Sequence, residues 1–172
     1  MADFTRKEIQ NIIALHGWMA GGANGSLETG IVLRGVDLSG VDLSGLYLRK
    51  AILSRADLSE AKLSSAYLNA AYLSRTNLRG ADLSWADLRE ADLAAANLYD
   101  AKLHGADLRK ADLREADMRG ADLREADLRD TLLMGTDLRG ADLRDARVTP
   151  DSLGQVASLM GAFLPDGGRG GE

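Results

Sequence analysis

Aspartate is the residue of this chain whose spacing could most readily support chemistry. Between Asp37 and Asp142 it recurs at multiples of five residues, at 13 positions. Carboxylates that a fold holds ~5 Å apart can bind a hard cation such as Ca²⁺. Asn77 and Asn97 occupy the same position in the pattern, which indicates that the side-chain oxygen bonds to nearby backbone amides instead. We therefore expect no metal site.

The other groups capable of chemistry form no catalytic pattern. The two histidines, His16 and His104, are far apart in sequence and have no metal-ligand or nucleophile spacing. The glycine-rich stretch 21–25 lacks the Lys-Ser/Thr that would hold a phosphate and its metal ion. The sequence thus predicts a protein that is not an enzyme and has no cofactor.

A strict repeat organises the chain and positions these side chains. Every fifth residue from Leu33 to Leu143 is leucine, except Met118, which gives 23 units without a slip. The residue two places before the leucine is small in 19 units, alanine in 16 and threonine in three; only the first four units have a larger one, Ile31, Val36, Val41 and Leu46. The unit reads A-(D/N)-L-x-x, as in Ala81-Asp82-Leu83-Ser84-Trp85.

A period of five residues fits neither a helix nor a straight strand. On a helix the leucines would be spread around the axis, and on a strand they would alternate between faces. A short extended segment followed by a bend places the small residue and the leucine inside and the bend at the fifth residue. Eight glycines from Gly35 to Gly140 occupy this corner, as a bend with positive φ favours.

On these residues the chain resembles the pentapeptide repeat family over about two-thirds of its length. The resemblance implies an all-β solenoid, a right-handed quadrilateral β-helix with four units per coil. The 23 units would then form about six coils, and with ~4.8 Å per coil the rod would be about 28 Å long. Residues twenty apart would stack, so Asp87, Asp107 and Asp127 would form one column and Arg89, Arg109 and Arg129 a neutralising column beside it.

Both ends of the repeat need a cover, because an open coil exposes its leucines and an unpaired backbone edge. We expect residues 1–30 to form an N-terminal capping helix and loop, with Thr5 and Glu8 as its capping box. Residues 31–148 form the repeat. A second capping helix of about ten residues is expected within 149–164, after Thr149-Pro150, followed by a disordered tail at 165–172.

Composition is typical of a soluble, single-domain protein, and we expect a cytoplasmic location and no membrane association. The chain has 172 residues, no cysteine, no apolar signal segment and a net charge of −5. These features, together with the repeat, suggest a bacterial protein of the intracellular kind.

Charge bears on one activity of the family, the mimicry of duplex DNA that protects or inhibits DNA gyrase. Such mimicry needs an acidic rod, since DNA carries one charge per ~1.7 Å. Residues 31–147 contain 20 acidic and 18 basic side chains, so the repeat has a mixed surface. Direct nucleic-acid binding is not expected either, because the arginines are interleaved with aspartates.

Two sets of apolar residues replace polar ones on outward positions. Aromatic and aliphatic residues gather in the N-terminal half and form a candidate partner-binding patch: Tyr47, Ile52, Tyr67, Tyr72 and Trp85. The alternative is that these rings only lie flat on the coil. A second set would form an end cap or a homodimer interface: Leu132, Met134, Leu153, Val156, Leu159 and Met160.

The sequence therefore favours a non-enzymatic solenoid that acts as an interaction or scaffold module and binds another protein through its side. Two alternatives stay open, namely a DNA-mimicking regulator or protector of gyrase and a structural rod without a defined partner.

Overall fold

The structure is a computed structural model that describes Lys7, Asn11 and residues 30–171. The predicted N-terminal capping helix, its capping box and the lead-in loop lie outside the described residues. The description below therefore concerns the repeat and the C-terminal end.

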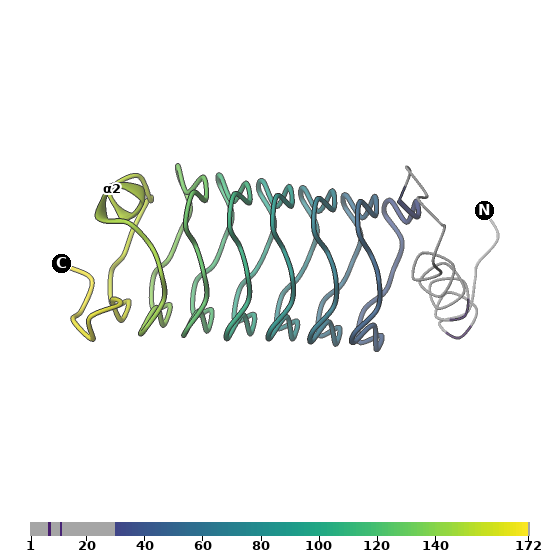
Figure 1. The fold of residues 1–172 in the computed structure, drawn as a ribbon, viewed down its shortest axis with the longest axis horizontal. Helices are drawn as coiled ribbons and strands as arrows, with labels where there is room; N and C mark the ends of the chain where they lie inside the picture. The colour runs from purple at the N-terminus through teal and green to yellow at the C-terminus, as the bar shows by residue number, and fades with distance from the viewer. Residues whose placement is uncertain (1–6, 8–10, 12–29, 172) are drawn as a thin grey trace.

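The described chain is a rod of stacked coils, with residue 30 and residue 171 at opposite ends (Figure 1). Short parallel bridges join residues that are twenty apart, as in the series Asp82, Lys102 and Asp122. Twenty residues are four units of five, so each coil has four sides. We call these face A, face B, face C and face D; their second unit residues begin at Val32, Asp37, Asp42 and Tyr47, respectively.

Backbone hydrogen bonds explain why a five-residue unit can repeat without long strands. In the unit that begins at Ala81, the Leu83 amide donates to the Lys102 carbonyl (2.7 Å), and the Asp82 amide donates to the Ala61 carbonyl (2.9 Å). The Ala86 amide closes the corner on the Leu83 carbonyl (3.0 Å). Each unit thus bonds to the coils before and after it and to its own turn, which satisfies most of its buried backbone groups.

All 23 corner residues of the repeat have positive φ. Eight of them are glycines, which confirms the predicted preference, but fifteen are residues such as Arg55, Trp85 and Glu115, with φ of 62°, 61° and 60°. A side chain costs free energy in this conformation. The coil-to-coil hydrogen bonds must therefore supply the energy that holds the corner wherever glycine is absent.

The interior consists of leucine and alanine, as the pattern predicts. Leu83, Leu103 and Leu123 are fully buried in one column, and the small residue of the same units is buried beside them. Threonine fits the small position because its hydroxyl finds an acceptor: Thr76 Oγ1 donates to the Leu53 carbonyl at 2.9 Å. A buried polar group is thereby satisfied without opening the core.

The C-terminal helix is shorter than expected. Helix α2 spans Pro150–Leu153, with Thr149 as N-cap and proline at the first position. The Ser152 amide donates to Thr149 Oγ1 at 3.2 Å. The start of the helix agrees with the sequence signals, but its predicted length of about ten residues is wrong, because the chain returns to the coil after Leu153.

Residues 157–166 add two further units, which the prediction missed. Ala157-Ser158-Leu159-Met160-Gly161 and the following Ala162-Phe163-Leu164 follow the same pattern, one residue out of phase. Bridges accordingly join Asp137 to Ser158 and Asp142 to Phe163, at a separation of 21 rather than 20. Helix α2 absorbs the extra residue on face A, so faces B and C have seven levels instead of the predicted six.

The glycine-rich tail, predicted to be disordered, covers the last open edge. Arg169 pairs with Phe163 in an antiparallel bridge, and the Gly170 amide donates to the Ala162 carbonyl at 2.7 Å. A Cβ at Gly170 would lie 2.1 Å from the Leu159 carbonyl oxygen, so only glycine fits there. No helix among the described residues is long and apolar enough to cross a membrane.

Candidate interaction surfaces

The outer surface carries the variation of this molecule, because the interior is nearly uniform. The second and fourth residues of each unit point outward, and the second residues pair with those twenty places away, or 21 at the last level of faces B and C. Each face therefore displays two side-chain columns along the rod. Any interaction of the rod with another molecule must involve these columns or the exposed corner residues between the faces.

Tyrosines occupy the first levels of face D. The rings of Tyr47 and Tyr67 stack with centroids 4.4 Å apart and planes 3° from parallel. The two residues are nevertheless 48% and 41% exposed, so solvent reaches the stack. This confirms that the two residues lie together on one face, as the sequence predicted.

Apolar residues continue on the adjoining face A. Ile52 pairs with Val32 on one side and with Tyr72 on the other, so the three form a single column. Val32 is 67% exposed and Tyr72 is 52% exposed, whereas Ile52 is half-buried. We call the combined area on faces A and D the docking surface, and it comprises Val32, Tyr47, Ile52, Tyr67 and Tyr72.

Trp85 does not belong to this surface. Its ring lies over Gly105, where an added Cβ would be 2.4 Å from the indole, and it meets the His104 ring edge-on at 5.1 Å. The ring thus extends toward the following coil rather than toward Tyr67. Among the described residues it makes no ring contact with a tyrosine, so the predicted five-residue patch separates into two parts.

The C-terminal half carries ion pairs in the same columns. In eight units the aspartate binds the arginine two residues later through both carboxylate oxygens, as in Asp127, whose oxygens accept from Arg129 Nε at 2.9 Å and Nη2 at 2.6 Å. The backbone amide of Arg129 also donates to the same carboxylate at 3.2 Å. The eight pairs are 87–89, 107–109, 112–114, 117–119, 122–124, 127–129, 137–139 and 142–144.

These contacts stabilise the charged form of the carboxyls. The hydrogen bonds from Arg129 hold the pKa of Asp127 below its ordinary value despite partial burial, and the same holds for Asp117 and Asp137 with their own arginines. Arginine therefore replaces a metal ion as the neutralising partner. The described residues contain no group of three His, Asp or Glu side chains arranged to hold a metal ion.

Asparagine has a separate use on face B. Asn77 Nδ2 donates to Asp57 Oδ1 at 3.0 Å, and Asn97 Nδ2 donates to Asn77 Oδ1 at 3.2 Å. The Asn77 oxygen also accepts the Arg79 amide at 3.3 Å. Asp and Asn interchange because both hold the backbone amide two residues on, as predicted, and the amide adds a bond between coils.

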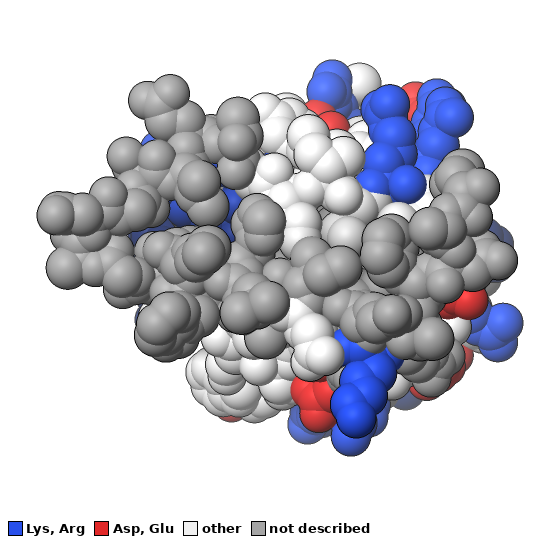
Figure 2. Space-filling model, turned by 90° about the vertical axis from the view of Figure 1, so that its right-hand side faces the viewer, with Lys and Arg blue, Asp and Glu red and all other residues white. Residues whose placement is uncertain are grey.

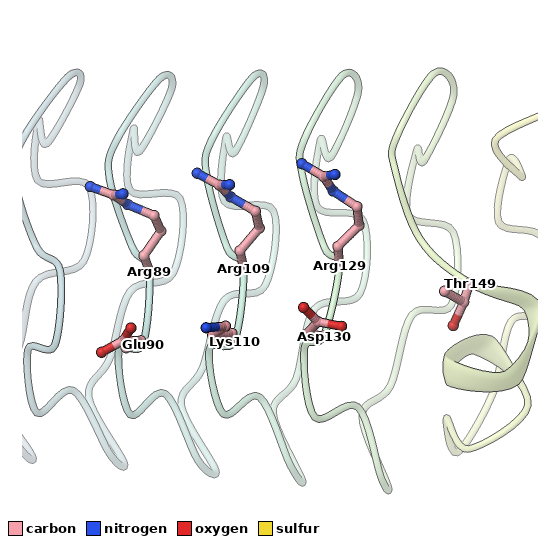
Figure 3. A pocket seen from close by; sticks show the side chains of 7 residues that line it. All are labelled: Arg89, Glu90, Arg109, Lys110, Arg129, Asp130 and Thr149. Carbon is pink, nitrogen blue, oxygen red and sulfur yellow. The ribbon is translucent and has the colours of Figure 1, made fainter.

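Arg89, Arg109 and Arg129 line a groove along face D, together with Glu90, Lys110, Asp130 and Thr149 (Figure 3). The three guanidinium groups point the same way from successive coils. Each is bound to the aspartate of its own unit, and Arg89 Nε also lies 3.6 Å from Asp107 in the next coil. The three arginines of this groove are therefore already paired with aspartates and do not form an open binding site for an anion.

The second predicted set of apolar residues is divided between the core and the surface. Leu153, Val156 and Leu159 are half-buried and pack against the core, which fits an end cap. Leu132, Met134 and Met160 stay exposed, with 49%, 58% and 60% of their surface accessible. Helix α2 therefore does not bury Leu132 and Met134, and the role of these residues as a dimer interface stays a prediction.

Sequence reasoning missed one aromatic contact of the outer columns. The Tyr99 ring lies between the guanidinium carbons of Arg79 and Arg119, at 5.5 Å and 5.4 Å from its centroid. Their spacing of twenty residues would have revealed this stack.

A view onto the N-terminal end shows the described basic side chains projecting from the rim, most of them on the right and at the bottom (Figure 2).

Comparison with protein families matches the chain to the family described as pentapeptide repeats, in eight copies over residues 29–55, 56–93, 96–133 and 111–149. No curated protein sequence matches it.

Several solved structures are similar to the chain. HetL of the cyanobacterium Nostoc, involved in the regulation of heterocyst differentiation, is 27% identical over 95% of this chain and 98% of its own, with a TM-score of 0.39. A pentapeptide repeat protein of the Arabidopsis thaliana thylakoid lumen is 30% identical over 78% and 80%, with a TM-score of 0.41. The plasmid-mediated fluoroquinolone resistance protein QnrB1 is 22% identical over 80% and 84%, with a TM-score of 0.34.

Proposed function

Because the chain belongs to the pentapeptide repeat family, we propose that it is a non-enzymatic rod that binds another protein through the docking surface. One observation carries this proposal: the columns that hold ion-paired aspartates in the C-terminal half hold exposed tyrosines and aliphatic residues in the N-terminal half. Exposed aromatic residues on a rigid support are favoured anchors for a protein partner.

The stacked tyrosines suit such a role. Their geometry is fixed by the coil spacing, so a partner would lose little conformational entropy in ordering Tyr47 and Tyr67. Each ring also keeps a hydroxyl that can bond across an interface. The coiled backbone holds the tyrosines rigidly, and the side chains of the outer columns determine which partner binds.

A pull-down with a matched control tests this proposal. Tyr67→Ala combined with Tyr72→Ala should lose a partner that the wild type retains, whereas Tyr99→Ala should keep it. The control removes the same ring from face B, where two arginines cover it. A purified partner should then bind the double variant at least tenfold more weakly. Equal capture by all three proteins would leave a structural rod as the better account.

The gyrase-directed alternative has a direct test. The eight Asp–Arg pairs cancel much of the negative charge that mimicry of DNA requires. We expect no inhibition of gyrase supercoiling, and no protection of gyrase from a quinolone, at micromolar protein. Clear potency in either assay would show that balanced surface charge is the wrong criterion.

A further inference from the structure

A second groove runs along face A, and it differs in charge from the groove on face D. Its volume is about 360 Å³, similar to the other. Its lining comprises Arg34, Ser54, Arg55, Ser74, Arg75, Ala94, Ala95 and Glu115, and we call it the basic groove.

The arginines of the basic groove have no acidic partner among the described residues. No ion pair joins Arg34, Arg55 or Arg75 to a described residue, whereas each arginine of the face D groove is bound to an aspartate. Glu115 is the one acidic residue of the lining, and it lies at the far end. The basic groove therefore has three uncompensated positive charges near the N-terminal end of the rod.

The floor of the basic groove consists of small residues, and an apolar column lies beside it on the same face. Ser54, Ser74 and Ala94 stack along the floor, and Ser74 Oγ donates to Ser54 Oγ at 3.4 Å. The column of Ile52 and Tyr72 stands beside this floor on the same face and belongs to the docking surface. A ligand in the groove would thus meet guanidinium groups on one side and apolar side chains on the other.

From this juxtaposition we infer that the basic groove binds an extended, acidic peptide segment of the partner, aligned with the rod axis. The inference rests on the proposed function and names the chemistry of the partner. Carboxylates of the peptide face Arg55 and Arg75 at the corner, and its apolar side chains face Ile52 and Tyr72. In an extended peptide successive side chains point to opposite sides, so acidic and apolar residues alternate in the segment.

The dimensions of the groove agree with such a segment. Arg34 and Glu115 lie four coil steps apart, or ~19 Å at ~4.8 Å per step, and an extended chain rises ~3.3 Å per residue. About six residues therefore span the groove. The acidic residues belong at the Arg34–Arg75 end, because Glu115 would repel a carboxylate at the other.

A single-stranded nucleic acid is the competing ligand. Its affinity would come from several phosphates and from bases stacked on aromatic rings. The groove offers three cations with a glutamate among its lining residues, and Ile52 and Val32 would find no use in binding phosphate. The combination of charge and aliphatic surface favours the peptide.

Selection from a displayed library of random dodecapeptides tests the chemical class without assuming a sequence. Wild-type protein should enrich peptides in which Asp or Glu alternates with apolar residues. The double variant Arg55→Glu plus Arg75→Glu should not enrich them. Glutamate is compatible with these corners, since Glu60, Glu90 and Glu115 already adopt positive φ at equivalent positions. Selected peptides without acidic enrichment would overturn the inference.

Binding of one selected peptide, labelled with fluorescein, then gives the magnitude. Loss of the two arginines should lower its affinity about tenfold or more, and raising the salt concentration should weaken binding to the wild type. Arg124→Glu plus Arg144→Glu is the matched control, because it reverses the same number of charges on face C, and it should leave binding within twofold. Thermal unfolding followed by circular dichroism verifies that both variants are folded.

The remaining outcomes separate this inference from the proposed function. A twelve-residue oligothymidylate that binds more tightly than the peptide, with the same dependence on Arg55 and Arg75, would overturn the peptide assignment. If no peptide depends on the arginines, but a cellular partner is lost with Tyr67→Ala plus Tyr72→Ala, the inference fails while the proposed function stands. If neither peptide binding depends on the arginines nor capture of the partner depends on the tyrosines, both the inference and the proposed function fail.

Discussion

The two halves of the rod share one backbone and one interior but present different outer surfaces. In the C-terminal half the second and fourth residues of most units are aspartate and arginine, which bind each other within the unit. In the N-terminal half the second position on faces A and D holds valine, isoleucine or tyrosine, and the fourth position is mostly serine. Arg34, Arg55 and Arg75 form no ion pair with a described residue. The coil therefore does not depend on the chemistry of its outer columns.

This independence distinguishes residues that fold the protein from residues available for recognition. Leucine and the small residue are buried throughout, so their replacement should be equally damaging in either half. Outer residues can differ between units without changing the fold, although the Asp–Arg pairs and the Asn bonds add stability where they occur. The predictions below test this division, from the largest expected effect to the smallest.

Charge in the core should unfold the rod wherever it is placed. Leu63→Asp in the N-terminal half and Leu103→Asp in the C-terminal half each bury an unpaired carboxylate between coils, at a cost of several kcal/mol. Far-UV circular dichroism with chemical denaturation should show both variants unfolded or strongly destabilised.

The control is Leu103→Met, since Met118 already occupies an equivalent buried position. Its cost should stay below about 1.5 kcal/mol. A wild-type-like Leu63→Asp beside an unfolded Leu103→Asp would show that the two halves do not share one core.

Removal of residues 149–172 should cause association. The truncation takes away α2, the two out-of-phase units and the tail, and it leaves the leucines and backbone edge of the preceding coil open. Exposed edges recruit other chains. Sedimentation velocity should show aggregates or end-to-end oligomers.

A different result would revise the role of this end. A full-length dimer that becomes a soluble monomer on truncation would place the removed segment, including Met160, in a native interface. A soluble monomer both before and after truncation would contradict the capping argument.

Acid should weaken the C-terminal half. The hydrogen bonds from arginine hold the pKa of Asp117, Asp127 and Asp137 below the ordinary value of ~3.9, so the unfolded chain takes up protons first as the pH falls. This stabilisation is fully present above about pH 5. It is lost as the pH falls below about 4 and passes through the lowered pKa values of these aspartates in the folded protein. The melting temperature should fall by several degrees over that interval.

The triple variant Asp117→Asn, Asp127→Asn and Asp137→Asn tests the source of this loss. Asparagine is already used at this position in Asn77 and Asn97, so the coil should tolerate it. Its melting temperature should depend less on pH than that of the wild type. An identical pH dependence would mean that other groups govern the acid sensitivity.

Two corner glycines should respond differently to the same change. Gly45 and Gly105 both have φ of +66°, and Ala70 and Ala95 show that alanine can adopt this conformation. A Cβ at Gly45 meets nothing within 4 Å, whereas one at Gly105 collides with the Trp85 ring. Gly105→Ala should cost about 1–2 kcal/mol and shift tryptophan emission, and Gly45→Ala should cost less. Equal losses would show that backbone strain alone decides.

The sequence predicted the part of the structure that the repeat controls. Each unit is hydrogen-bonded to the units twenty residues away. This arrangement explains why the leucines are buried, why their neighbours are small and why glycine is frequent at the corners. The repeat is so regular that an insertion of one residue concealed its last two units, although Ala157-Ser158-Leu159-Met160-Gly161 carries the pattern. Helix propensity after Thr149-Pro150 was a local signal, and coil-to-coil hydrogen bonding overrode it.

Side-chain direction was less accessible to prediction. The spacing of twenty residues correctly predicted that Tyr47 stacks on Tyr67, because the backbone sets which residues lie in one column. The direction of Trp85 depends on the missing side chain at Gly105 in the next coil, and the corner pattern does not reveal which neighbour a ring will choose. The unpaired state of Arg55 and Arg75 likewise became visible only with the neighbouring columns in place.

The Asp–Arg pairs have a consequence for how such a rod could change its length. Both members of a pair lie within one five-residue unit, so the pairs of four complete units need no partner from another coil. Duplication of twenty residues from the C-terminal half would lengthen the rod by ~4.8 Å and return every later residue to its original face. The chemistry at the distant N-terminal half would be unchanged. Length can thus vary by whole coils without altering recognition.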